Sequence, residues 1–193
     1  MRHFVYFSGE AMTSGNFDVN NLMKAGRMDI AVHFIINAFF LSHSLRDDVK
    51  LHLIFYGMPD PPKHIEMQIT SETKLSKKDV AGLLKKMLYK YKPGTKTEVF
   101  PGCFIEKKSF LKVVEELANQ GKELFILDKR GEALRKIKIP SESVFIVGDH
   151  NGFPKKELKR LKEVAKTVSV GPKTYFASQV ATILNNELDL RGL

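Results

Sequence analysis

Cysteine is nearly absent from this chain of 193 residues, with Cys103 as the single one. One thiol excludes an internal disulfide framework and any zinc cluster held by several thiolates. No apolar run is long enough to span a bilayer, because the strongest one, residues 30–41, is interrupted by His33 and Asn37. The first residues, "MRHFVYFSGE", lack the charged, apolar and small-residue segments of a secretory signal. We therefore expect a globular, cytoplasmic protein that does not insert into a membrane.

Two common catalytic signatures are also missing. The six histidines are scattered, with no His-x-x-x-His pair on a predicted helix and no cysteine cluster to complete a metal site. No Gly-x-Ser-x-Gly sequence is present that could form the turn carrying a nucleophilic serine. The sequence thus predicts neither a bound metal nor serine nucleophile chemistry.

Positive charge, in contrast, is abundant. The chain has 31 Lys and Arg residues against 22 Asp and Glu residues, which gives a formal charge of +9 and an isoelectric point near 9.5. An excess of this size favours a polyanionic partner, with nucleic acid as the leading candidate. The alternative is a Lys-rich surface that serves solubility or heat tolerance, and charge alone does not decide between the two.

Short apolar strands alternate with amphipathic helices along the chain. Strands are predicted at residues 3–8, 49–57, 64–70, 123–128, 144–149 and 167–171, and helices at residues 26–48, 77–91, 113–121, 155–167 and 174–188. Regular alternation with unbroken apolar strands indicates an α/β protein with a mostly parallel sheet. Because no repeat or low-complexity linker interrupts the pattern, we expect one domain over residues 1–193.

The helix predicted at residues 26–48 is expected to be largely buried. Its apolar face carries Ile30, Phe34, Ile35, Ala38 and Leu41. The helix predicted at residues 77–91 begins with Ser76 as its N-cap and has Asp79 three residues later, which is a capping box. Its outer face carries Lys77, Lys78, Lys85, Lys86 and Lys90. These lysines, with Lys107 and Lys108, could follow RNA phosphates or form an ordinary solvated surface.

The turn "GDHNG", residues 148–152, joins an apolar strand to a basic helix. Glycines at such a turn let backbone amides approach a phosphate. The dinucleotide fingerprint is incomplete, however, because only Gly148 and Gly152 are present and no acidic residue ends the next strand. Asp149 and His150 are compatible with a turn that hydrogen-bonds its own backbone or with a cofactor contact, and the residues alone leave both open.

Three loops at the carboxyl ends of predicted strands indicate a binding pocket. They contain Leu127, Gly148 and the run "SVGP" at residues 169–172. In open α/β sheets ligands bind outside the carboxyl ends of the strands. Apolar rims and exposed amides hold a flat base by its faces and by backbone groups. The pattern therefore favours a nucleoside cofactor over a triphosphate.

These segments, taken together, resemble a known family. "FIVGDHNGF", a helix and "VSVGPKTYFASQVATILNNEL" are similar to the carboxyl-terminal part of SPOUT methyltransferases. "AGRMDIAVHFIINAFFLSHSLRDDV" and "LIFYGMPDPPKHI" are similar to the archaeal tRNA pseudouridine-54 N1-methyltransferases, and the resemblance covers nearly the whole chain. It implies a C-terminal deep trefoil knot, a homodimer, S-adenosylmethionine (SAM) as cofactor, and methylation of N1 of the T-loop pseudouridine in tRNA.

The resemblance also assigns residues to the cofactor. Carried over by position, these are Leu127, Gly148, Asp149, His150, Val168, Ser169, Val170, Gly171, Pro172 and Val180. The chain departs from the family at two places, since relatives have cysteine at the position of Val180 and Ser-Pro at that of Gly171-Pro172. Because backbone amides and apolar surface make most of the expected contacts, both changes are compatible with binding.

Arg27 and Asp29, in "GRMD", stand at the start of the first predicted helix. The related ribosomal pseudouridine methyltransferases have a similar Arg-x-Asp. We hypothesise that Asp29 accepts a hydrogen bond or the N1 proton from pseudouridine, and that Arg27 grips a phosphate or ring carbonyl of the RNA. The alternative is a helix cap with a neighbouring ion pair. Arg46 is a further RNA-binding candidate, because the resemblance places its loop near the active site.

Two rival functions remain. A methyltransferase of the same fold acting on ribosomal RNA pseudouridine would be favoured by a long RNA-gripping insertion, and none is evident. An RNA-binding module without cofactor would be favoured by loss of the glycine loops, which are retained. The tRNA enzyme is therefore the leading prediction.

Overall fold

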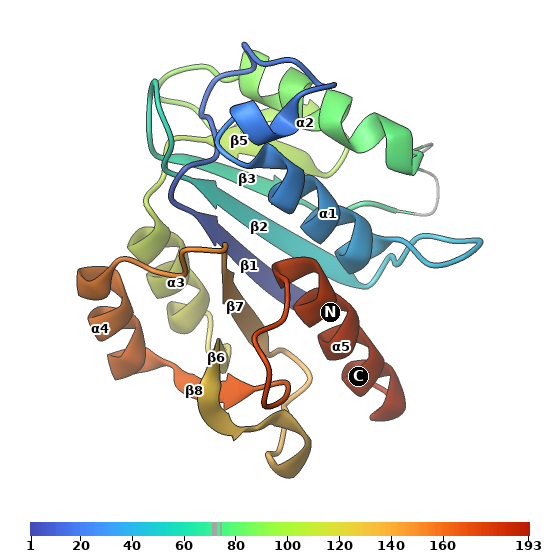
Figure 1. Ribbon diagram of the computed structural model, residues 1–193, viewed down its shortest axis with the longest axis vertical. Helices are drawn as coiled ribbons and strands as arrows, with labels where there is room; N and C mark the ends of the chain where they lie inside the picture. Colours follow the sequence, from blue (N-terminus) through green and yellow to red (C-terminus); the bar gives the residue numbers. More distant parts are fainter. Residues whose placement is uncertain (71–72, 74) are drawn as a thin grey trace.

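Eight strands form one sheet in the computed structural model, which describes residues 1–70, 73 and 75–193. The strand order is β4-β5-β3-β2-β1-β7-β6-β8 (Figure 1). The strands are β1 (Arg2–Ser8), β2 (Val49–Phe55), β3 (Lys63–Met67), β4 (Thr97–Phe100), β5 (Cys103–Glu106), β6 (Leu124–Ala133), β7 (Val144–Gly148) and β8 (Lys166–Ser169). The helices are α1 (Met28–Phe39), α2 (Val80–Tyr89), α3 (Phe110–Asn119), α4 (Lys155–Val164) and α5 (Ala177–Leu190), with short 3-10 helices η1 (Leu22–Lys24), η2 (Lys77–Asp79) and η3 (Leu134–Lys136).

The sheet is mixed, and the prediction of a mostly parallel sheet holds for one part of it. Strands β2, β1, β7, β6 and β8 pair with one another in parallel. Strands β3, β5 and β4 extend the sheet with antiparallel pairing. The α/β class is therefore confirmed, while the antiparallel part is larger than the alternation of strands and helices suggested.

The sequence pattern missed β4 and β5. Each strand has four residues, and Pro101 and Gly102 separate them, so neither offers a long alternating pattern. Gly102 has a φ of +73°, and a Cβ there would lie 2.4 Å from the carbonyl oxygen of Gln68. This turn therefore requires glycine, and it folds β5 back against β4.

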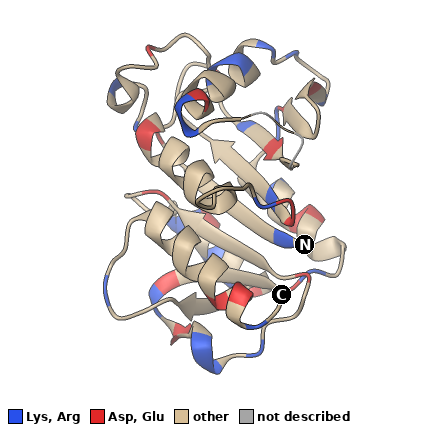
Figure 2. Cartoon of the chain, turned by 90° about the vertical axis from the view of Figure 1, so that its right-hand side faces the viewer, with Lys and Arg blue, Asp and Glu red and all other residues tan. Residues whose placement is uncertain are grey.

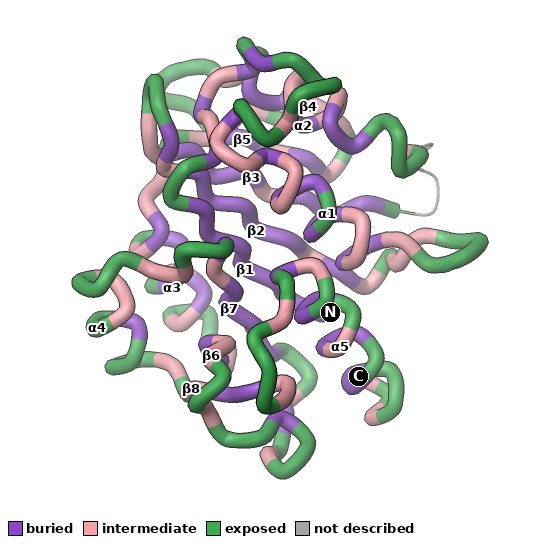
Figure 3. The backbone as a smooth tube through the Cα atoms, in the orientation of Figure 1, coloured by how far each residue is buried: buried purple, intermediate pink, exposed green. Residues whose placement is uncertain are grey.

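Helices cover both faces of the sheet (Figure 1). One core contains apolar side chains of α1, α2 and α5, whereas a second core contains those of α3 and α4. The central strand β1 is buried along its whole length, as the tube in Figure 3 shows. Burial on both faces explains why the central strands are continuous apolar runs.

The first long helix is shorter than predicted. It begins at Met28 and ends at Phe39, and Leu41, expected on its buried face, is 44% exposed. After the helix, Phe40 forms an antiparallel bridge with Leu45, and Leu41 donates its backbone N–H to Ser44. The polar "SHS" segment therefore forms a loop whose backbone groups bond to each other. None of the described helices combines the length and apolar character needed to cross a membrane.

Candidate functional site

Arg27 and Asp29 form a two-pronged ion pair at the start of α1. The guanidinium donates from Nε to Oδ1 and from Nη2 to Oδ2 of Asp29, both at 3.0 Å. Arg27 has a φ of 60°, a left-handed conformation that is uncommon for residues other than glycine. Its side chain is 36% exposed and that of Asp29 is 22% exposed. The pair thus faces solvent from a strained backbone, as functional residues often do.

The ion pair fixes the charge of Asp29. The hydrogen bond from Arg27 lowers the pKa of the Asp29 carboxyl below its usual range. Asp29 is therefore an ionised hydrogen-bond acceptor at neutral pH. Neither residue caps the helix through its side chain. Of the alternative role, a helix cap with a neighbouring ion pair, only the ion pair is therefore observed.

Asp149 organises the turn between β7 and α4. Its carboxylate accepts hydrogen bonds from the hydroxyl of Ser8 at 2.9 Å and from the backbone N–H of Gly9 at 3.0 Å. It also accepts the backbone N–H of Asn151 at 2.9 Å, two residues further along the chain. Asp149 therefore hydrogen-bonds the backbone of its own turn, which was one of its two expected roles. Its carboxylate also links β7 to the end of β1.

Gly148 and His150 lie in the same turn. A Cβ on Gly148 would approach the Cα of Gly152 to 2.9 Å, so the tight turn itself requires a residue without a side chain. His150 is exposed, and its Nε2 is 3.9 Å from Oε2 of Glu10. These positions border the carboxyl ends of β1 and β7.

A cavity of about 510 Å³ lies between the segment that ends β6, the loop that follows β8, and α5. Its lining consists of Gly131, Ala133, Leu134, Arg135, Ser169, Val170, Gly171, Pro172, Tyr175, Ile183 and Glu187. The predicted run at residues 169–172 is all present in it. The other seven residues were not predicted, because they lie in β6, η3, α5 and the loop before α5 and share no sequence motif.

The loop after β8 is held in shape by its own contacts. The hydroxyl of Ser169 donates to the carbonyl of Gly171 at 2.8 Å and accepts its N–H at 3.2 Å. Tyr175 packs over Gly171, since a Cβ there would lie 3.0 Å from the Tyr175 hydroxyl. The loop is thus pre-formed, with its backbone against the cavity.

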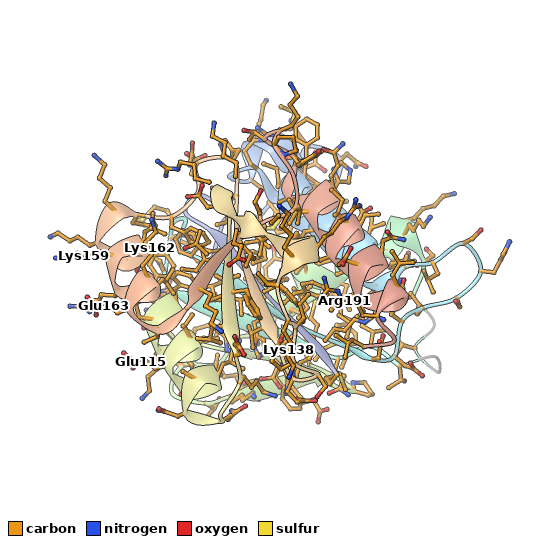
Figure 4. All side chains as sticks on the ribbon, turned by 90° about the horizontal axis from the view of Figure 1, so that it is seen from below. Glu115, Lys138, Lys159, Lys162, Glu163 and Arg191 are labelled. Carbon is orange, nitrogen blue, oxygen red and sulfur yellow. The ribbon has the colours of Figure 1, made fainter. Side chains whose placement is uncertain are left out.

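One end of the cavity is charged. Glu187 on α5 accepts hydrogen bonds from Arg191 at 2.7 and 2.9 Å and lies 3.5 Å from Arg135. Arg191 also donates to the carbonyls of Leu134 and Ile137, and Figure 4 shows it extending from α5 toward the sheet. The carboxylate of Glu187, which is buried, therefore has its charge balanced by two guanidiniums.

The remaining predicted cofactor residues do not line this cavity. Val168 is fully buried in the core, and Leu127 packs against that core. Val180 is only 8% exposed and belongs to the same core, whereas Ile183, one turn further along α5, faces the cavity. Of α5, the structure thus places Ile183 rather than Val180 in the cavity wall.

The residues predicted to bind RNA lie in different parts of the structure, and several pair with other residues of the chain. Arg46 pairs with Asp189 at the end of α5, beside Arg2 at the start of β1. Within the chain it therefore lies beyond the C-terminal end of α1, whereas Arg27 lies at the N-terminal end of that helix. Of the predicted lysines, Lys85 donates to the carbonyl of Phe17, Lys107 binds Asp60, and Lys108 binds Glu106 and Glu116. Figure 2, in which the right-hand side of Figure 1 faces the viewer, shows Lys and Arg spread among Asp and Glu.

Comparisons with known proteins are consistent with this geometry. Over residues 1–193 the chain matches the protein family described as "Putative SAM-dependent RNA methyltransferase". A relative from Methanococcoides burtonii, named tRNA (pseudouridine(54)-N(1))-methyltransferase, is 36% identical over 98% of this chain and 96% of its own length. A relative of the same name from Thermococcus gammatolerans is 33% identical over 98% of this chain and 97% of its own.

Among solved structures, that of Archaeoglobus fulgidus Nep1 bound to S-adenosylhomocysteine is similar in fold. Its TM-score is 0.67 at 16% sequence identity, and the match covers 100% of this chain and 99% of that chain. The family match extends over the whole chain, and the curated relatives match nearly all of it at more than 30% identity. The chain therefore belongs to this family of RNA methyltransferases, together with the tRNA (pseudouridine(54)-N(1))-methyltransferases.

Proposed function

We propose that the chain transfers a methyl group from SAM to N1 of pseudouridine 54 in the T-loop of tRNA. The observation that carries the proposal is the cavity beside the loop at residues 169–172, combined with the family membership of the whole chain. A volume of about 510 Å³ lies within the range that small-molecule and cofactor sites occupy, roughly 300–1,000 Å³.

The residues present fit the cofactor. Leu134, Val170 and Ile183 give apolar surface against which an adenine ring can lie, and the backbone at residues 169–172 offers N–H and C=O groups to its edge. The charged end at Glu187 suits the polar part of a nucleoside, because ribose hydroxyls donate hydrogen bonds to a carboxylate. When bound, SAM supplies an electrophilic methyl group on a sulfonium.

On the RNA side, the chain must orient N1 of the base and accept its proton. In the transfer, a bond forms between N1 and the methyl carbon as the bond from that carbon to sulfur breaks. Asp29, already ionised, accepts the hydrogen bond or the proton of N1–H. Arg27 holds the carboxylate in place, and its exposed edge is available to a phosphate or ring carbonyl. Alignment of N1 with the methyl carbon is then the main requirement, and the transfer needs no metal ion.

Several finer features belong to the same proposal. The C-terminal part would form a deep trefoil knot, which the close passage of Gly131 against the backbone of Val168 supports. The chain would act as one domain, in the cytoplasm and as a homodimer. The dimer is supported by Phe176, the N-cap of α5, and Leu190, its last residue, which are 76% and 74% exposed. Leu127, Gly148, His150, Val180 and Arg46 remain proposed contacts, the last of them to RNA.

Two measurements test the proposal against its rivals. Calorimetry with SAM separates the enzyme from an RNA-binding module, since the enzyme binds one SAM per chain and the module binds none. Transfer of labelled methyl groups is then compared between pseudouridylated tRNA and a pseudouridylated ribosomal RNA fragment. Labelling of tRNA alone supports the proposal, whereas labelling of the ribosomal fragment alone overturns its choice of substrate.

A further inference from the structure

Two buried histidines lie side by side on the face of the sheet that α3 covers. His52 on β2 is 4% exposed and His64 on β3 is 2% exposed. Nδ1 of His52 is 2.9 Å from Nε2 of His64, and the rings stack with centroids 5.2 Å apart. They border a cavity of about 210 Å³ that is also lined by Val113 and Leu117 of α3. The cavity above the loop at residues 169–172 is lined by α5, which packs on the other core, so the two are separate.

A carboxylate fixes the proton on His64. Nδ1 of His64 is 3.0 Å from Oε1 of Glu106, and the ionised carboxylate can only accept. Nδ1 therefore carries the proton, and Nε2 keeps a lone pair that points toward His52. A histidine whose second nitrogen donates to a carboxylate is the usual arrangement of a metal ligand, because the carboxylate sets both the tautomer and the ring orientation.

Glu66 adds a third donor to the pair. One ligand atom each of His52, His64 and Glu66 lies within 4.8 Å of the others. Lys50 and Lys96 hold the two oxygens of Glu66 at 2.8 and 2.9 Å. The group is thus a positioned carboxylate, and each oxygen has a second lone pair that the lysine does not use.

We propose that His52, His64 and Glu66 bind one divalent transition-metal ion, with zinc as the expected metal. Two imidazole nitrogens and a carboxylate oxygen are donors that zinc prefers, and three protein ligands leave a fourth position for water. The cavity of about 210 Å³ has room for that water. Since the ligands come from β2 and β3, the ion would clamp the parallel part of the sheet to its antiparallel extension.

Binding of an ion requires the two rings to move, because their facing nitrogens are hydrogen-bonded to each other. Ligand atoms of a tetrahedral zinc site are about 3.3 Å apart for Zn–N bonds of about 2.0 Å. The two nitrogens must therefore separate by a few tenths of an ångström from their 2.9 Å. The hydrogen bond between Nδ1 of His52 and Nε2 of His64 must break in this shift. Nε2 of His52 has no hydrogen-bond partner among the residues that the structure describes, so that nitrogen does not oppose it.

This site departs from the sequence-based expectation that the chain holds no metal. That expectation considered His-x-x-x-His spacing on helices. On antiparallel strands the register decides which side chains meet, and here it pairs His52 with Glu66 and Ile54 with His64. A spacing of twelve residues between histidines on two strands then brings both rings to the same face.

The competing interpretation is a hydrogen-bonded pair with no metal, in which His52 donates from Nδ1 to Nε2 of His64. Titration of the chelator-treated, tag-free full chain with ZnCl₂ separates the two. We expect one Zn²⁺ per chain, a rise in melting temperature with Zn²⁺ concentration, and at least a tenfold loss of affinity in His64→Gln and Glu66→Gln. A matched control, His43→Gln, changes an exposed histidine outside the cluster and should bind as the wild type does.

The visible spectrum of Co²⁺ provides a second readout that needs no variant. Intense bands of four-coordinate Co²⁺ in the wild-type chain, displaced by one equivalent of Zn²⁺, support the site even if a histidine variant fails to fold. Circular dichroism checks the fold of each variant. The proposal is overturned if the wild type binds no Zn²⁺, if Co²⁺ keeps its weak six-coordinate spectrum, or if the folded Glu66→Gln and His64→Gln chains bind as tightly as the wild type.

Discussion

Arg46 donates two hydrogen bonds to the carboxylate of Asp189, with N–O distances of 2.8 and 2.6 Å. The same carboxylate accepts a hydrogen bond of 2.6 Å from Arg2, whose side chain is 7% exposed. The loop after α1, the end of α5 and the start of β1 are therefore joined by one shared charge. Arg46 was predicted to bind RNA, and its place in this network gives it a structural function within the chain.

The first prediction concerns this network. In Asp189→Asn, Arg46 loses its ionic partner and Arg2 keeps only its ion pair with Asp48. We expect the free energy of unfolding to fall by about 1 kcal/mol, a modest value because Asp189 is 41% exposed. Urea denaturation measures the change. The control is Asp47→Asn, an exposed aspartate in the same loop as Arg46. Equal stability of Asp189→Asn and wild type would show that the network contributes nothing.

The second prediction concerns the pH dependence of the same contribution. The hydrogen bond from Arg46, followed by that from Arg2, lowers the pKa of Asp189 in the folded state. A carboxyl with a lowered folded pKa contributes stability that is complete above its unfolded pKa of about 3.9 and is lost as pH falls further. The difference between wild type and Asp189→Asn should thus be constant from pH 5 to 8 and shrink below about pH 4. A difference that grows on acidification would contradict the lowered pKa.

The third prediction concerns Asp29. Replacing it with Asn keeps the shape but removes the charge that accepts the N1 proton. We expect the single-turnover rate to fall by about 10²–10⁴, the usual contribution of a positioned base. Affinity for tRNA, measured by filter binding, should change little. Near wild-type methylation by this variant would leave Asp29 as a purely structural partner of Arg27.

The fourth prediction concerns the close passage of β6 against β8. A Cβ on Gly131 would lie 2.5 Å from the backbone of Val168, so Gly131→Ala must push the strands apart next to the cavity. We expect the variant to lose about 1–3 kcal/mol of stability, as overpacking does, and to bind SAM more weakly by calorimetry.

Gly82 provides the matched control for that substitution. It lies in α2, where an added Cβ meets no atom of the described structure within 4 Å. Gly82→Ala should stabilise the chain by roughly 0.4–1 kcal/mol through helix propensity and leave SAM binding unchanged. Equal effects of the two substitutions on SAM affinity would show that SAM does not bind in this cavity.

Some parts of the fold could be predicted from the sequence, because their signal is local. The capping box at Ser76 forms as expected, with its backbone N–H donating to Asp79 at 3.3 Å. The end of the helix predicted at residues 113–121 also has a local signal, since Gly121 follows α3 with a φ of +77°. Both features depend on neighbours in the chain, which sequence patterns report well.

Other parts depend on contacts between distant residues, which periodicity does not report. The sequence indicated the loop at residues 169–172, but not that Leu134 and Glu187 would complete the cavity around it. It did not indicate that Arg46 would pair with Asp189, a residue 143 positions further along the chain. Pairing of His52 with His64 likewise follows from strand register, which no helical spacing rule detects.

The central claim is methylation of N1 of a T-loop pseudouridine, and mass spectrometry of T-loop nucleosides tests it most directly. The full chain is incubated with SAM and with tRNA that carries pseudouridine or unmodified uridine at position 54. We predict N1-methylpseudouridine at that position in the first tRNA and no methylation in the second, since the glycosidic bond of uridine occupies N1. Unmethylated pseudouridine 54 after incubation with folded, SAM-binding protein, or methylation of the uridine tRNA to the same extent, would contradict the account.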